Sequence, residues 1–194
     1  MAGPFALLVE GDLDEAVGRR IVRAAGGEIG VVYPKRGIGY IRTRLAQFDQ
    51  SAQHVPLLVL ADLADTRYPC PPALIEAWLP EQRGRTVFRI VEQMIESWLF
   101  ADRKGIAHYL RVSVDRIPHV PESLPNPKAH LARESRSATI RNQLVPRGST
   151  ARVGPGYSSL LRRFVDDQWN LDMARRQASS LDRCLRAVSA EATR

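Results

Sequence analysis

Residues 5–91 alternate short apolar runs with segments of helical period, and this alternation constrains the fold more than any other feature. The runs FALLVE, EIGVVY, VPLLVLAD and TVFRIV predict strands. The segments DEAVGRRIVRAA, GYIRTRLAQF and residues 72–79 predict the helices between them. Such alternation is typical of a parallel sheet with right-handed crossovers. VPLLVLAD is apolar without interruption, as expected when helices cover both sheet faces. We therefore expect an α/β fold.

Beyond Val91 the pattern becomes helical. EQMIESWLFAD has an apolar stripe with Glu92 and Glu96 at its edge, four residues apart on one predicted helix. The prolines of IPHVPESLPNP exclude a helix there and predict an ordered strap. YSSLLRRFV and the segment from SSLD onward predict the last helices. We expect an α/β core over residues 1–115. Residues 116–194 would supply the strap, a basic segment and C-terminal helices packed on that core.

Five carboxylates follow three of the predicted strands. Glu10 ends the first strand, Asp62 and Asp65 follow the third, and Glu92 and Glu96 follow the fourth. Ligands of parallel sheets bind beyond the carboxyl ends of the strands. Carboxylates brought so close need a cation, and oxygen ligands favour magnesium or manganese over zinc. We predict a metal site here. The alternatives are a turn residue for Asp65 and solvated helix acids for Glu92 and Glu96.

Glu10 is the strongest candidate ligand. It ends a buried strand, and Gly11 after it allows a ligand to approach the backbone closely. The acids behind it suit the start of the next helix. Asp12 or Asp14 fits its N-cap, and Glu15 fits its first turn, where the helix dipole favours negative charge. We do not expect these three residues to bind metal.

The excess positive charge of the chain is concentrated in one segment. The 28 Lys and Arg residues exceed the 21 Asp and Glu residues by seven, and residues 128–163 carry eight bases and one acid. Guanidinium groups pair with phosphate oxygens in bidentate fashion, so the segment predicts a nucleic-acid surface. The residues expected to bind nucleic acid are Arg133, Arg136, Arg141, Arg162 and Arg163. The alternative is a solvated basic loop.

Several classes of protein are disfavoured. No apolar run is long enough to span a membrane, and the N-terminus has no basic segment or cleavage site typical of a signal peptide. These features predict a cytoplasmic protein that does not bind membranes. Cys70 and Cys184 are far apart and lack a CxxC pattern, so neither a disulfide framework nor a zinc site is expected. We expect both to be buried thiols.

The acidic motifs carry a family resemblance. LLVEGDLDE resembles the first motif of Toprim domains, the metal-dependent fold of topoisomerases, bacterial primases and nucleases of the overcoming-lysogenization-defect class. LLVLADLAD stands at the position of the second motif. Together with EQMIESWLFAD, PESLPNPKAHL, GPGY and SLDRCLRAV, the chain resembles the Toprim-like bacterial domain of unknown function 4276 family over nearly its whole length. The resemblance implies a Rossmann-like Toprim sheet, a role in phage defence and an ATPase partner.

The resemblance also implies roles for particular residues. Glu10 would be a metal ligand and general acid or base, and Asp62 a second metal ligand. Glu92 and Glu96 match the positions that complete a second metal in the nuclease branch. The second motif departs from the family pattern, because its usual second aspartate corresponds to Ala64 and the next acid is Asp65. Lys128 would stabilise the negative charge of the transition state; the alternative is a surface lysine.

Three functions are compatible with these features. The leading hypothesis is a nuclease, a magnesium- or manganese-dependent phosphodiester hydrolase acting on DNA or RNA. The second is a regulatory or effector subunit that binds an ATPase through its C-terminal helices without catalysing a reaction, and the spacing of Asp62 and Asp65 favours it. The third is a nucleotide-binding module, because GIGYIR at residues 37–42 places a glycine turn before a helix.

Overall fold

The computed structural model describes residues 4–135, 140–145 and 153–194 and divides into two compact units. The first contains residues 1–92 and 180–194, and the second contains residues 93–179. The second unit is therefore inserted into the first. The boundary expected between residues 115 and 116 falls inside this second unit, and the last helix of the chain belongs to the first unit.

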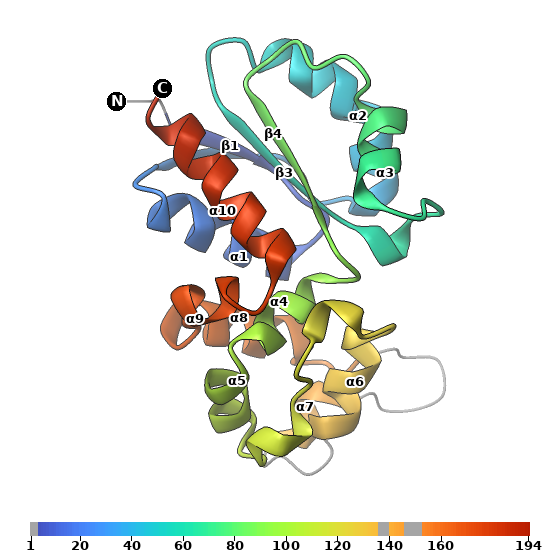
Figure 1. The fold of residues 1–194 in the computed structure, drawn as a ribbon, viewed down its shortest axis with the longest axis vertical. Coiled ribbons are helices and arrows are strands. Elements are labelled where there is room, and N and C mark those ends of the chain that lie inside the picture. Colours follow the sequence, from blue (N-terminus) through green and yellow to red (C-terminus); the bar gives the residue numbers. More distant parts are fainter. Residues whose placement is uncertain (1–3, 136–139, 146–152) are drawn as a thin grey trace. The chain divides into compact units, whose positions relative to one another are not determined.

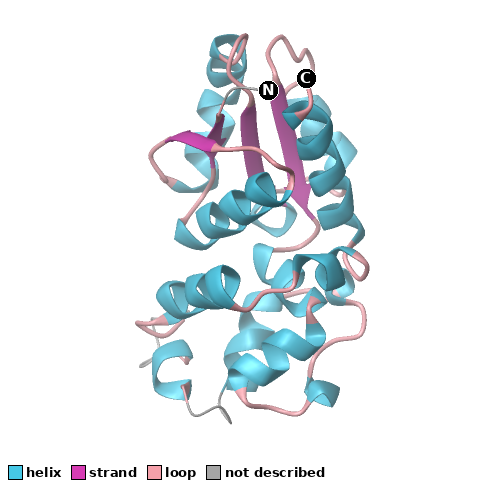
Figure 2. Ribbon diagram, turned by 90° about the vertical axis from the view of Figure 1, so that its left-hand side faces the viewer, coloured by secondary structure: helices cyan, strands magenta, loops and turns pink. Residues whose placement is uncertain are grey.

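The first unit is built on a parallel sheet, and the predicted strands and their parallel arrangement are confirmed. The strands are β1 (Phe5–Leu8), β2 (Ile29–Val32), β3 (Leu57–Asp62) and β4 (Thr86–Val91). Their order in the four-stranded sheet is β2-β1-β3-β4, and all neighbours pair in parallel. Figure 2 shows that the strands drawn for the described residues all belong to this unit.

Helices cover both faces of the sheet (Figure 1). They are α1 (Asp12–Ala24), α2 (Gly37–Ser51), α3 (Pro71–Trp78) and α10 (Ser179–Ala192). Helices α2 and α3 lie on one face, and α1 and α10 lie on the other. Side chains of alternate residues therefore enter two apolar layers. In β3, Leu57 and Val59 join the core under α2 and α3, whereas Leu60 packs beside Gly18 of α1.

The second unit is helical, as predicted for the residues beyond Val91. Its helices are α4 (Ile95–Ala101), α5 (Arg103–Leu110), α6 (Pro127–Glu134), α7 (Arg141–Leu144), α8 (Tyr157–Asp167) and α9 (Leu171–Arg175). Trp98, Phe100, Phe164 and Trp169 are fully buried in it. The 3-10 turn η2 (Val114–Arg116) precedes the proline-rich strap, and η3 (Pro121–Ser123) lies within it. Pro127 does not exclude a helix but begins α6, where its missing N–H is tolerated.

Two local expectations are wrong. Glu92 and Glu96 do not share a helix, because α4 begins only at Ile95 and Gln93 has a positive φ of 71° that turns the chain after β4. Cys70 is not a buried thiol but an exposed one, whereas Cys184 is buried as expected. Cys70 directly precedes α3, in the loop at the carboxyl end of β3 where the chain runs over the surface.

Candidate metal centre

The strand order creates a crevice between β1 and β3. The chain crosses from β1 to β2 on one side and reaches β3 on the other side of β1. The connections that follow β1 and β3 therefore leave the carboxyl ends of these two neighbouring strands in opposite directions. Parallel sheets bind ligands at such a point. Glu10 follows β1 by two residues, and Asp62 is the last residue of β3. Both residues thus lie at the sheet edge where the sequence predicts a metal site.

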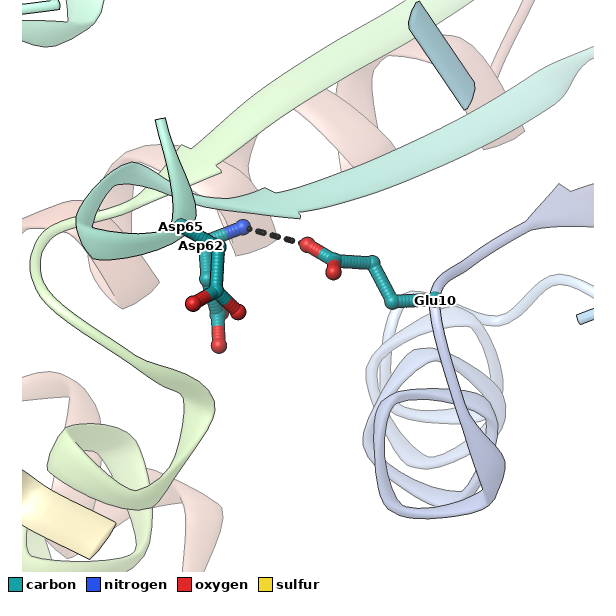
Figure 3. A group of neighbouring side chains, drawn as sticks. All are labelled: Glu10, Asp62 and Asp65. Atoms are coloured by element: carbon teal, nitrogen blue, oxygen red, sulfur yellow. Dashed lines mark hydrogen bonds between the residues drawn. The ribbon is translucent and has the colours of Figure 1, made fainter. Parts of the chain in front are cut away.

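Glu10 and Asp62 are linked across this crevice. The backbone N–H of Asp62 donates a hydrogen bond to Oε1 of Glu10 at 3.0 Å (Figure 3). Glu10 is half-buried, whereas Asp62 is only 5% exposed. The link fixes the position of the Glu10 carboxylate relative to β3, so that one acidic group is held between the ends of two strands.

Asp65 joins this pair through a 3-10 turn. Asp62 precedes η1 (Leu63–Asp65), so the two aspartates are three residues apart across it. Figure 3 shows the two aspartate side chains extending in the same direction. Glu10, Asp62 and Asp65 each place a possible ligand atom so that all three atoms lie within 4.8 Å of one another.

The donor atoms of this group suit a hard divalent cation. All three side chains offer carboxylate oxygens, and neither a histidine nor a cysteine belongs to the group. Oxygen ligands favour magnesium or manganese, whereas structural zinc sites generally use nitrogen and sulfur. Asp65 is exposed, so the group is open to solvent on one side. The residues therefore fit a magnesium or manganese ion that keeps positions for water or substrate.

The acids behind Glu10 are engaged elsewhere. The N-cap of α1 is Gly11 and not Asp12 or Asp14 as expected; Asp14 is the third residue of α1 and accepts a hydrogen bond from the backbone N–H of Gly11 at 3.1 Å. Lys35 contacts Asp12 at 2.6 Å and Glu15 at 2.5 Å, and Arg19 contacts Glu15 at 2.7 Å. Burial of Glu15 acts to raise its pKa, but the hydrogen bonds from Lys35 and Arg19 outweigh burial and lower that pKa. The same contacts with Asp12 and Glu15 raise the pKa of Lys35.

Glu92 and Glu96 have different surroundings. Glu92 belongs to the first unit and forms an ion pair with Arg183 of α10. Glu96 belongs to the second unit and is 1% exposed. Its Oε1 accepts a hydrogen bond from the hydroxyl of Tyr157 at 2.8 Å and lies 3.8 Å from Nζ of Lys128. The three-carboxylate group contains neither acid, and Lys128 contacts Glu96 in the second unit.

The described arginines of the basic segment all belong to the second unit. Arg133 contacts Glu134 at 3.0 Å, and Arg116 contacts the same carboxylate group at 2.6 Å. Burial acts to raise the pKa of Glu134, but the hydrogen bonds from both arginines lower it. Arg141 and Arg163 are exposed, and Arg162 is half-buried. Arg136 lies outside the described residues.

A pocket lies beside the three carboxylates, and the sequence indicated only a part of it. It has a volume of about 390 Å³, and Asp65 forms part of its wall. Its other main residues are Ile38, Arg42, Arg67, Tyr68 and Trp78. The GIGYIR segment indicated the part contributed by α2. Arg67 and Tyr68 are the other indication of this pocket in the sequence. They lie shortly after the end of a predicted strand, next to the candidate ligand Asp65.

Fold and site together define an α/β protein with a parallel sheet and a carboxylate centre at the point where its crossovers diverge. Comparisons of the chain with protein-family models, curated proteins and solved structures found no match. Among the described helices, none combines the length and apolar character needed to cross a membrane.

Proposed function

We propose that this protein is a magnesium- or manganese-dependent phosphodiester hydrolase that acts on nucleic acid. The observation that carries the proposal is the approach of Glu10, Asp62 and Asp65, whose possible ligand atoms lie within 4.8 Å of one another at the crevice of a parallel sheet. Three acids from two strand ends repel one another, so this arrangement favours a bound cation.

The three carboxylates would hold the cation from two sides of the crevice. Glu10 approaches from the end of β1, whereas Asp62 and Asp65 approach from the end of β3. The hydrogen bond from Asp62 orients Glu10 before any ligand arrives, which limits the reorganisation needed on binding. A bound magnesium or manganese ion would supply Lewis-acid polarisation of a phosphate and a more acidic water.

The spacing of Asp62 and Asp65 is compatible with this function. The family pattern places its aspartates two residues apart, and the departure of this chain from that pattern favoured the alternative of a subunit without catalytic activity. In this structure, however, Asp62 and Asp65 belong to one group whose possible ligand atoms lie within 4.8 Å of one another, so Asp65 supplies the second carboxylate that Ala64 lacks. The geometry supports a catalytic site over the regulatory alternative.

Nucleic acid is the proposed substrate because of the charge of the second unit. Exposed Arg141 and Arg163 and half-buried Arg162 could contact phosphates without specifying a base sequence. The family resemblance extends the proposal to a bacterial defence system with an ATPase partner. It also assigns Lys128 to charge stabilisation, although in this structure Lys128 lies 3.8 Å from the buried carboxylate of Glu96.

Manganese binding measured by calorimetry, together with cleavage of labelled DNA and RNA, tests this proposal. The wild type should bind manganese and cleave only when a divalent cation is present. Glu10→Gln and Asp62→Asn should lose both properties. Glu76→Gln is the matched control, because Glu76 is an exposed acid on α3 outside the carboxylate group. Absence of manganese binding in the wild type, or unchanged binding in both site variants, would overturn the proposal.

A further inference from the structure

The pocket beside Asp65 has a composition suited to one nucleotide. We call it the aromatic pocket, formed mainly by Ile38, Arg42, Asp65, Arg67, Tyr68 and Trp78. Its volume of about 390 Å³ is at the small end of the range for ligand pockets, roughly 300 to 1,000 Å³. A pocket of this size accepts a single small ligand but not a base pair with its backbone.

Two arginines of the aromatic pocket are available to an anion. Arg42 lies on α2 and Arg67 lies in the loop after η1, and both are exposed. In the described part of the chain, no ion pair or side-chain hydrogen bond engages either guanidinium. Asp65, which also lines the pocket, belongs to the carboxylate group. An anion held by these arginines would therefore lie next to the candidate metal centre.

The aromatic side chains form a rigid part of the wall. The rings of Trp78 and Phe88 are stacked, with centroids 6.2 Å apart and an interplanar angle of 12°. The ring of Tyr68 meets that of Trp78 edge to face, with centroids 6.3 Å apart. Tyr68 and Trp78 are half-buried, so part of each remains accessible. Fixed aromatic rings contact bases favourably whatever the base sequence.

We infer that the aromatic pocket holds one unpaired nucleotide of a single strand, directly beside the phosphate presented to the carboxylates. The base would contact Tyr68 and Trp78, and its phosphate would contact Arg42 and Arg67. A base that contacts these rings cannot remain stacked and paired in a duplex. The inference deepens the proposed function, on which it rests, because it makes single-stranded or locally unpaired nucleic acid the substrate.

Tryptophan fluorescence provides a direct test. Trp98 and Trp169 are 0% and 1% exposed and belong to the second unit, so Trp78 is the half-buried tryptophan that a ligand can reach. Titration with AMP or dAMP in the presence of EDTA should quench the emission of the wild type. Trp78→Phe should remove the quenching while calorimetry still detects binding, because phenylalanine retains an aromatic face.

Arginine variants determine whether the aromatic pocket holds the phosphate. Arg42→Ala and Arg67→Ala should each weaken AMP binding about tenfold, the effect of losing a charge-assisted hydrogen bond. Arg44→Ala is the matched control, because Arg44 is an exposed arginine on the same helix that does not line the pocket. It should bind AMP like the wild type. Equal losses in all three variants would overturn the inference.

Competition experiments separate this inference from the proposed function. A single-stranded oligonucleotide should displace AMP, whereas a blunt duplex of the same sequence should not. AMP binding should persist in Glu10→Gln, because the aromatic pocket does not need the metal. Metal-dependent cleavage without AMP binding, or equal displacement by the duplex, would overturn the inference and leave the proposed function intact. AMP binding in a protein that binds no manganese would overturn the proposed function and the substrate assignment that rests on it, but not nucleotide binding by the aromatic pocket.

Discussion

The backbone N–H of Asp62 donates a hydrogen bond to the side chain of Glu10 at 3.0 Å, and this contact joins the ends of β1 and β3. The acceptor is one oxygen of a carboxylate, so the contact combines a structural role with the negative charge needed for a cation. The two roles can be separated, because glutamine keeps an acceptor oxygen but lacks the charge.

Replacement of Glu10 should therefore have different effects on stability and on metal binding. Glu10→Gln should unfold at nearly the wild-type temperature yet fail to bind manganese. Glu10→Ala should lose about 1 kcal/mol of unfolding free energy as well, because the Asp62 N–H loses its partner. Thermal unfolding measures the stability of each variant, and calorimetry measures its manganese binding. If the glutamine and alanine variants are equally destabilised, the hydrogen bond does not have the role assigned to it.

The position of Asp65 can be tested by moving the acid one residue. The double variant Ala64→Asp/Asp65→Ala has the spacing of the family pattern that the sequence resembles, but it moves the carboxylate away from position 65, whose oxygen lies near those of Glu10 and Asp62. We expect this double variant to bind manganese about tenfold more weakly than the wild type, because one charged ligand contact is lost. Asp65→Ala should show the same loss. Wild-type affinity in the double variant would show that the turn does not select the ligand.

Glu15 should make stability depend on pH. Its pKa is lowered below the ordinary value of 4.5, because the hydrogen bonds from Lys35 and Arg19 outweigh its burial. The charged form therefore stabilises the fold above pH 4.5, and that contribution is lost as the pH falls through the folded-state pKa. Glu15→Gln should cost about 1 kcal/mol at pH 7, since the ion pairs are partly solvated.

Urea unfolding of the Glu15→Gln variant over a range of pH checks this expectation. The difference in unfolding free energy between the variant and the wild type should shrink as the pH falls below 4.5. The control is Glu28→Gln, because Glu28 is an exposed acid of the same unit. A difference that stays constant into acid would mean that the effect comes from packing and not from charge.

The two cysteines should react at very different rates. Cys70 is exposed, whereas burial raises the pKa of Cys184 to about 12. The thiolate is the reactive form, so at pH 8 a disulfide reagent should label one thiol rapidly. Cys70→Ser should remove this fast reaction, and unfolding in denaturant should expose Cys184. Two rapidly labelled thiols in the folded protein would contradict the burial of α10.

The arginines of α8 should contribute to nucleic-acid binding. The double variant Arg162→Ala/Arg163→Ala should bind DNA or RNA more weakly and reduce the slope of affinity against salt by about one to two units. The adjacent pair Arg175 and Arg176 of the same unit is the matched control. Fluorescence anisotropy at several salt concentrations provides the measurement. An unaltered slope would show that these arginines do not contact phosphates.

Much of the first unit could be predicted from the sequence because its strands are buried on both faces. An uninterrupted apolar run such as residues 57–61 is typical of a parallel strand that helices cover on both sides. The sequence predicted C-terminal helices packed on the core, but it could not show that α10 is the one that belongs to the sheet unit. Its buried stripe, which includes Leu181, Cys184 and Val188, has the same period whichever apolar surface it covers.

The candidate site was predictable where residues follow strands directly and less so where backbone turns intervene. Glu10 and Asp62 could be selected because strand ends meet at one sheet edge. Gln93 has a positive φ of 71°, which is uncommon for a residue other than glycine and cannot be inferred from local propensity. It removes Glu92 from the helix of Glu96. The aromatic pocket combines α2 with the loop after β3, a tertiary arrangement that periodicity does not encode.

The return of α10 to the sheet has a consequence for synthesis of the protein. Arg85, just before β4, contacts Glu191 at 2.5 Å, and Glu92 pairs with Arg183. The strands leave the ribosome long before α10, which covers one sheet face together with α1. During translation, the inserted second unit emerges while the part of this face that α10 covers is still open. A nascent chain stalled before residue 180 should consequently be a substrate for chaperones, although its second unit is complete.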